Sequence, residues 1–131
     1  MSDSMQIVAV KAKPGKPSIY RLILRLSRPI PKDAVFELVF PEAFGLDLLE
    51  VAGAQGMKGG IQLAVDGQKV VLRRTGLGKE VRAGEKVVLK MGLIKNPPNL
   101  EDEYRVTLTV RSKEADNPLL KSDVRVAFQL R

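Results

Sequence analysis

Few residue types in this sequence can carry nucleophilic or acid–base catalysis. The 131 residues include no His and no Cys. The first absence removes the commonest general base and transition-metal ligand, and the second removes disulfides and thiolate sites. Ser and Thr are present without their usual partner bases, and no spacing points to the remaining options, a Ser–Lys dyad or a carboxylate pair. The sequence therefore predicts a protein that is not an enzyme and uses no cofactor.

Binding of a polyanion is the chemistry that the charge balance favours. The chain has 22 Lys and Arg against 15 Asp and Glu, a net charge of +7. If the strands that carry the outward-facing arginines are neighbours in one sheet, these side chains form a basic face for nucleic acid, an acidic envelope polymer or lipid headgroups. The simpler interpretation is a solvated sheet face whose cations guard against aggregation. The candidate basic face consists of Arg21, Arg25, Arg105, Arg111, Arg125 and Arg131.

Carboxylates gather in two expected loops near the C-terminal end of the sequence. One loop holds residues 101–103, and the next holds Glu114 and Asp116. Two loops of this kind could hold Ca²⁺, which takes six or more oxygen ligands. The spacing matches no EF-hand loop, and solvated turn residues are the simpler interpretation. We therefore predict no metal site.

An internal Lys–Asn isopeptide bond is a further option for a β-sandwich. Lys11 or Lys13, on the first expected strand, and Asn117, near the last, would be the pair to test. Nothing in the sequence places them together, and Asn followed by Pro is a typical turn. An intact mass would decide the question, because the bond releases one ammonia.

Alternation of apolar and polar residues dominates the chain and predicts β-strands. Residues 104–111 are the clearest case, with Tyr104, Val106, Leu108 and Val110 on one face. Such alternation indicates one buried face and one solvated face, as in antiparallel sheets. Asp66 followed by Gly67 marks a hairpin between two such segments. The expected strands are residues 6–11, 19–27, 34–40, 48–52, 61–65, 69–74, 86–91, 104–111 and 124–131.

These short strands, separated by Pro-, Gly- and Asn-rich turns, predict an all-β fold. We expect an immunoglobulin-like Greek-key β-sandwich of about 7–9 antiparallel strands, with a closed barrel as the lesser alternative. Residues 1–131 form a single domain in this interpretation. Residues 1–5 are expected to be a flexible or cloning-derived terminus.

Four local patterns occur in an order that resembles one class of domain. They are FPEAF at 40–44, VRAGEKVV at 81–88, IKNPP at 94–98, and YRVTLTVRSKE at 104–114 followed by Pro118 and Ser122. The order resembles the immunoglobulin-like β-sandwich modules of prokaryotic cell-surface and S-layer-associated proteins, from about Lys11 to Phe128. One departure concerns the turn before Tyr104. That class usually has a Gly there, whereas this chain has LEDE at 100–103.

The resemblance implies a non-catalytic structural, adhesion or spacer module of a cell-envelope protein. Its partners would be neighbouring domains or other proteins, bound through strand edges or faces. Two alternatives remain open at this point. One is a free-standing basic protein that binds a polyanion through the Arg/Lys sheet face. The other is a subunit of a filament or surface layer, whose oligomeric state the sequence does not specify.

The location of the protein depends on whether the chain is complete. Its N-terminus has neither a basic region nor an apolar segment of the secretory kind, and no stretch approaches the ~20 apolar residues of a membrane span. We expect the cell envelope or the extracellular space if the chain is a trimmed module, and the cytoplasm if it is complete as given. Charged residues make up 28% of the chain, which suggests heat tolerance that a thermal melt would test.

Overall fold

The computed structural model describes residues 3–113 and 117–130, which form nine strands and no helix. No segment in these ranges is therefore a helix long and apolar enough to cross a membrane. The strands are β1 (Ser4–Ala9), β2 (Pro17–Arg25), β3 (Ala34–Val39), β4 (Val51–Gln55), β5 (Ile61–Asp66), β6 (Lys69–Arg74), β7 (Val87–Lys95), β8 (Arg105–Ser112) and β9 (Leu120–Phe128).

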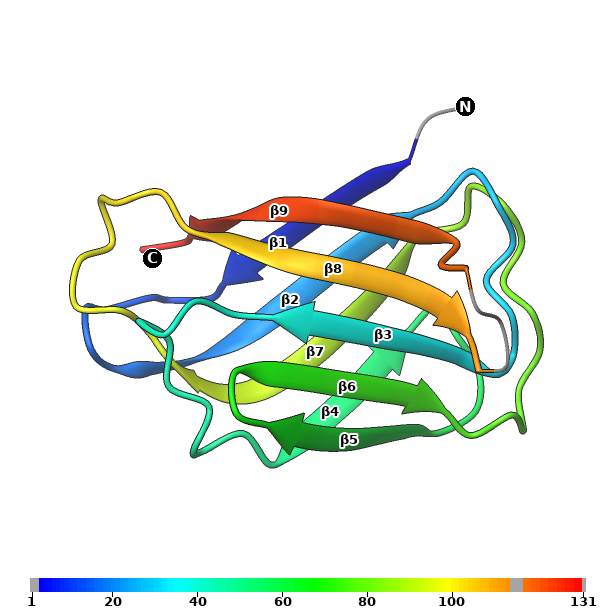
Figure 1. Ribbon diagram of the computed structural model, residues 1–131, viewed down its shortest axis with the longest axis horizontal. Helices are drawn as coiled ribbons and strands as arrows, with labels where there is room; N and C mark the ends of the chain where they lie inside the picture. Colours follow the sequence, from blue (N-terminus) through cyan, green and yellow to red (C-terminus); the bar gives the residue numbers. More distant parts are fainter. Residues whose placement is uncertain (1–2, 114–116, 131) are drawn as a thin grey trace.

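The strands pack as two layers. Their hydrogen-bonded order is β4-β7-β2-β1-β9-β8-β3-β6-β5, and the layer of β9, β8, β3, β6 and β5 lies in front of the other in Figure 1. Neighbours that are distant in sequence, such as β2 with β7 and β3 with β8, are the Greek-key feature. The predicted all-β, immunoglobulin-like sandwich is confirmed.

Period-two alternation fills the space between the layers. On β2, Tyr20, Leu22 and Leu24 are fully buried, whereas Arg21 and Arg25 are exposed. On β8, Val106, Leu108 and Val110 are buried in the same way. An aromatic cluster adds to this core, and its rings meet mostly edge to face, a favourable geometry for ring quadrupoles. The cluster consists of Tyr20, Phe40, Phe44, Tyr104 and Phe128.

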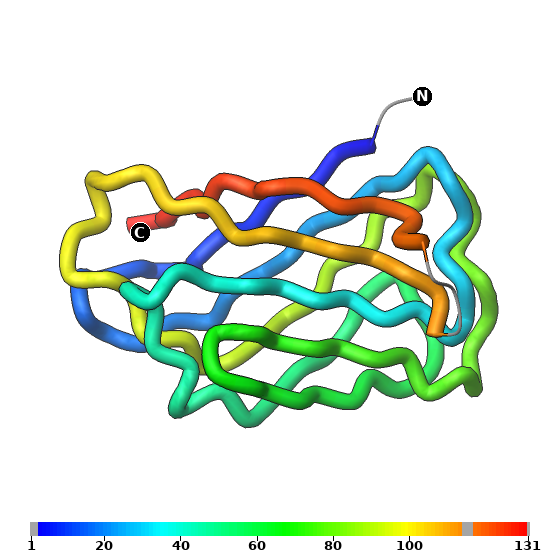
Figure 2. Tube along the Cα trace, viewed as in Figure 1, coloured from blue at the N-terminus to red at the C-terminus, as the bar shows by residue number. Residues whose placement is uncertain are grey.

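β1 and β9 form the one parallel pair among the strand pairs of the described chain. Their register runs from Ile7 opposite Val126 to Ala9 opposite Phe128. β9 pairs with β8 over its earlier residues and with β1 over its last ones, so it connects the two layers. Because β1 and β9 are parallel, the start of the chain and its end lie at opposite ends of the sandwich, as the trace shows (Figure 2).

β1 begins earlier than the sequence suggests. Its first residue, Ser4, pairs with Arg25 of β2 and lies within the segment 1–5 that we expected to be a flexible terminus. The carboxylate of Asp3 also accepts hydrogen bonds from the backbone N–H and the hydroxyl of Ser27. Residues 4 and 5 therefore belong to β1.

Candidate functional site

Two of the predicted arginines lie side by side on the outer face of the front layer. Arg105 of β8 is directly opposite Arg125 of β9. Both guanidinium groups approach the carboxylate of Glu103, with Nε–O distances of 3.4 Å for Arg105 and 3.6 Å for Arg125. All three side chains are at least half exposed. Much of the positive charge of this pair is therefore balanced locally.

Arg111, farther along the same face of β8, belongs to a different charge cluster. Its Nη2 lies 3.0 Å from Oε1 of Glu37, and Lys69 Nζ lies 3.4 Å from Oε2 of the same carboxylate. Partial burial alone would raise the pKa of Glu37, but the hydrogen bond from Arg111 and the charge of Lys69 outweigh it and hold the pKa below 4.5. One carboxylate thus ties together β8, β3 and β6.

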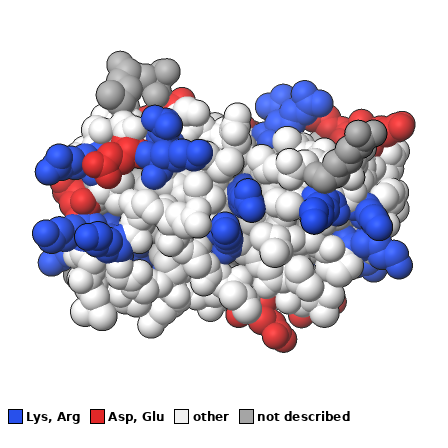
Figure 3. All heavy atoms as spheres, turned by 180° about the vertical axis from the view of Figure 1, so that it is seen from behind, with Lys and Arg blue, Asp and Glu red and all other residues white. Residues whose placement is uncertain are grey.

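The remaining arginines of the candidate basic face are elsewhere. Arg21 and Arg25 lie on β2, on the outer face of the rear layer. Figure 3, which views the molecule from that side, shows Lys and Arg in small separate groups with uncharged surface between them. Arg131 lies outside the described residues. The structure therefore brings Arg105 and Arg125 together, and binding of a polyanion by these residues stays a prediction.

A buried arginine is a feature that sequence reasoning missed. Arg74, the last residue of β6, is only 6% exposed because the alternation of β6 turns it toward the core. Its Nη1 donates to the carbonyl oxygen of Pro31 at 2.8 Å, and its Nη2 donates to those of Lys58 and Lys79 at 2.8 and 2.6 Å. Burial lowers the pKa of Arg74, and the nearby charge of Asp33 opposes that shift. The guanidinium fastens three loops at one end of the sandwich.

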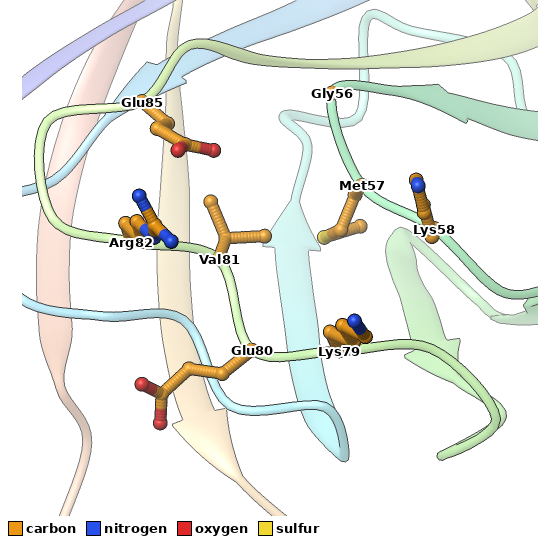
Figure 4. A pocket seen from close by; sticks show the side chains of 8 residues that line it. All are labelled: Gly56, Met57, Lys58, Lys79, Glu80, Val81, Arg82 and Glu85. Carbon is orange, nitrogen blue, oxygen red and sulfur yellow. The ribbon is translucent and has the colours of Figure 1, made fainter.

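Two of those loops enclose a pocket of about 300 Å³ at this end of the sandwich. Met57 and Val81 face each other across it, and the carboxylate of Glu85 points inward, whereas Glu80 points away (Figure 4). Gly56, Lys58, Lys79 and Arg82 complete the lining. The pocket therefore combines a small apolar floor with charges of both signs.

A second buried polar cluster joins β2 to the end of β7. Asn96, 1% exposed, donates from Nδ2 to the hydroxyl of Ser18 at 2.9 Å and to the carbonyl oxygen of Lys13 at 3.2 Å. Its side-chain oxygen accepts a hydrogen bond from the hydroxyl of Tyr20. Burial raises the pKa of that phenol well above its usual range. In the sequence, Asn96 precedes two prolines, a pattern that indicates a turn and does not reveal the buried cluster.

An apolar hollow of about 420 Å³ lies on the outer face of the rear layer. It forms because Gly53 and Gly92 have no side chains to cover the sheet there, and its walls include Ile19, Val51 and Leu93. These three apolar side chains are 40–69% exposed. Lys90 is the one charged residue among those that line the hollow.

A grouping of side chains that could hold a metal ion is not found in the described ranges. No cluster of three or more His, Cys, Asp or Glu side chains positioned to hold an ion occurs there. Glu114 and Asp116, two of the five carboxylates considered as Ca²⁺ ligands, lie outside the described residues. What the molecule offers chemically is strand edges, charged faces and small pockets, which are means of binding.

Comparison with known proteins identifies the fold but no family. No protein-family model matches the sequence, and no curated protein matches it. Solved structures do match. The full-length major pilin SpaD from Corynebacterium diphtheriae superposes with a TM-score of 0.58 at 17% identity, over 93% of this chain and 34% of the pilin. The chain thus spans about a third of the pilin's length.

Two further structures match over nearly their whole length. The sixth cohesin of scaffoldin B from Acetivibrio cellulolyticus, solved in complex with a dockerin, gives a TM-score of 0.53 at 14% identity, over 98% of this chain and 100% of the cohesin. The collagen-binding subdomain of the Enterococcus faecalis surface protein ACE gives 0.55 at 11% identity, over 94% and 95%. Identities this low show a shared fold alone. The structural neighbours include pilin, adhesin and cohesin domains, with which this chain shares its fold.

Proposed function

We propose that this chain is a non-catalytic structural module of a cell-envelope protein, which holds neighbouring domains or partners apart and transmits tension between them. The observation that carries the proposal is the parallel pairing of β1 with β9. A chain that enters at β1 and leaves after β9 crosses the module from one end to the other. Serial linkage of such modules extends a protein by a full module length each time.

The same pairing determines how tension would act. Pulling the two ends apart slides β1 and β9 along each other in opposite directions, so their ladder hydrogen bonds are loaded together and not one after another. The ladder spans Ile7 to Ala9 opposite Val126 to Phe128. Two further bonds extend it, from Gln129 N–H to Ala9 O at 2.9 Å and from Ala12 N–H to Gln129 O at 2.6 Å. Loading in parallel is the stronger arrangement.

The comparisons support the same class of function. The similar structures include a pilin, a collagen-binding subdomain and a cohesin bound to a dockerin. The dockerin and the collagen are binding partners of those proteins. For this chain, the support is that a sandwich of this fold can serve in adhesion and assembly without a catalytic site.

Force spectroscopy on a molecule held by its two ends tests the mechanical part. Gln129→Pro removes the backbone N–H that bonds to Ala9 O, whereas Gln129→Ala keeps it. The Gln129 side chain is exposed, so its loss in either variant removes no buried contact. We expect Gln129→Pro to unfold at a clearly lower force and Gln129→Ala to match the original chain. Equal forces for all three proteins would contradict the proposal.

Fractionation of source cells tests the location. An antibody raised to this chain should detect, in the envelope fraction, a band larger than the chain itself. A band of this chain's own size in the soluble fraction would remove the envelope from the proposal.

The polyanion alternative keeps one supporting observation, the exposed pair of Arg105 and Arg125. Because Glu103 contacts both, we expect only weak binding of DNA or heparin. Binding through these cations would fall steeply as salt rises, and it would fall further in an Arg105→Ala, Arg125→Ala double variant. Tight binding that the double variant abolishes would favour this alternative over the structural module.

A further inference from the structure

The sheet ends in two strands whose outer edges are unpaired in the described structure, β4 and β5. They lie along the same long side of the sandwich, one behind the other (Figure 1). Their sequences are VAGAQ and IQLAVD, so Asp66 is the one charged residue in the two strands. In a chain with 28% charged residues, these two edge strands are almost without charge.

β5 lacks the features that usually protect an open edge. Natural edge strands carry Lys, Pro or a bulge that prevents another strand from pairing. β5 contains neither residue, and its register with β6 runs without interruption from Ile61 opposite Arg74 to Asp66 opposite Lys69. Val65 is 40% exposed, and Ile61 and Leu63 are partly buried. An extended segment can therefore reach this edge.

The hydrogen-bond phase of the β5–β6 hairpin shows which backbone groups are open. Thr75 N–H donates to Gly60 O at 3.0 Å, so these two residues are a hydrogen-bonded pair of the ladder. Hydrogen-bonded pairs recur at every second residue of an antiparallel ladder, so the next such pair is Gln62 with Arg73. The N–H and C=O groups of Ile61, Leu63 and Val65 consequently point away from β6. No other described strand pairs with that side.

We propose that two copies of this chain associate by antiparallel pairing of β5 with β5, around a two-fold axis at Leu63. In this register Leu63 lies opposite its own copy, and Ile61 lies opposite Val65. All three residues then pair their open backbone groups, and their side chains meet apolar partners. On the outer face Gln62 lies opposite Ala64, so no like charges are placed together.

Net charge argues for this surface as the contact between copies. Two molecules that each carry +7 repel, and that repulsion is smallest where neither surface bears a cation. The self-complementary register also satisfies the requirement of a two-fold interface, in which one patch meets itself. This inference does not depend on whether the module carries tension, so the two proposals can fail separately.

The pairing is expected to be weak. A single six-residue strand buries less accessible surface than stable complexes do, which bury about 800 Å² on each partner. We therefore expect a dissociation constant between about 10 μM and about 1 mM, which matters where copies are concentrated or tethered.

Sedimentation velocity across that concentration range tests the proposal with a matched pair of variants. Ala64 and Ala127 are both exposed on strands, but Ala64 lies on the β5 edge, whereas Ala127 lies on β9, away from that edge, and pairs with Val8 of β1. We expect the original chain to shift from monomer to dimer. Ala64→Lys should weaken association at least tenfold, and Ala127→Lys should leave it unchanged.

A backbone variant tests the register. Val65→Pro removes an N–H that makes no bond within the hairpin, so the fold should survive and association should be lost. Far-UV circular dichroism checks folding, and Ala64→Lys remains informative if Val65→Pro does not fold. A monomer at every concentration, or equal effects of the two Lys variants, would overturn the proposal.

Discussion

The hydroxyl of Tyr20 donates a hydrogen bond to the side-chain oxygen of Asn96, 76 residues away in sequence, and both side chains are buried. The other end of the Asn96 amide bonds to Ser18 and to the backbone of Lys13. A single amide thereby connects the start of β2, the loop before it and the segment after β7.

Removal of that amide should destabilise the fold strongly. Asn96→Ala leaves the buried hydroxyls of Tyr20 and Ser18 without this partner, and unsatisfied buried polar groups cost about 1–3 kcal/mol each. We expect a loss of about 3 kcal/mol in the free energy of unfolding, measured by urea denaturation. Gln62→Ala, at an exposed position, is the control and should change little. A comparable loss in both variants would argue against a special role for the cluster.

Arg74 and Arg73 are adjacent on β6 but face opposite sides, which makes them a matched pair. Arg74→Leu leaves three carbonyl oxygens, those of Pro31, Lys58 and Lys79, without their charged donor. We expect a loss of about 3 kcal/mol or more, whereas Arg73→Leu should stay within about 0.5 kcal/mol. Chemical denaturation measures both, and hydrogen exchange should show faster opening of residues 56–60 in Arg74→Leu. Equal stability of the two variants would contradict the fastening role.

Glu37 should make stability depend on acid pH. Its pKa in the folded protein is below the ordinary value of 4.5, so the ionised form favours folding. That contribution is fully present above about pH 4.5 and is lost as the pH falls through the lower folded pKa. Glu37→Gln should therefore be less stable than the original chain at about pH 7, with a gap that narrows toward about pH 3. A gap that is constant with pH would refute the assignment.

Gly78 and Gly53 should respond in opposite ways to a methyl group. A Cβ on Gly78 would lie 1.9 Å from the carbonyl oxygen of Lys58, whereas one on Gly53 would meet nothing within 4 Å. Gly78→Ala must push two loops apart and should cost about 1–3 kcal/mol. Gly53→Ala should be neutral or slightly stabilising, because Ala loses less conformational freedom in a strand. Thermal melts of the two variants make the comparison, and a stable Gly78→Ala would show that the loops can separate freely.

The sequence predicts those strands well whose burial follows strict alternation. β2 and β8 lie within about two residues of the expected 19–27 and 104–111. β7 extends to Lys95, past its expected end at 91. The buried residues Met91 and Ile94 are three apart there, so the period-two pattern breaks although the strand continues.

β4 begins and ends three residues later than expected. The sequence suggested residues 48–52, but the strand is Val51–Gln55. Leu49 is buried although it lies at a turn and not in a strand. In the sequence, its apolar side chain cannot be distinguished from one that is buried in a strand. The weak pattern of small residues that follows contains no apolar side chain large enough to reveal the true strand.

The positions of the candidate basic residues and of the buried Arg74 were harder to predict, because they depend on which strands become neighbours. Arg105 and Arg125 meet since β8 pairs with β9, whereas Arg21 lies on the other layer, and alternation alone does not distinguish these outcomes. Arg74 carried a usable signal, because it shares the phase of the buried Val70 and Leu72. Its three acceptors come from loops whose positions no local pattern specifies.

The double pairing of β9 has a consequence for the way the molecule melts. Because β9 is hydrogen-bonded to β8 in one layer and to β1 in the other, neither layer can dissolve without breaking a ladder of the other. The two layers therefore cannot separate along β9 without loss of backbone hydrogen bonds. Heat should therefore abolish both layers in one cooperative transition, with equal calorimetric and van't Hoff enthalpies and no intermediate that keeps a single sheet.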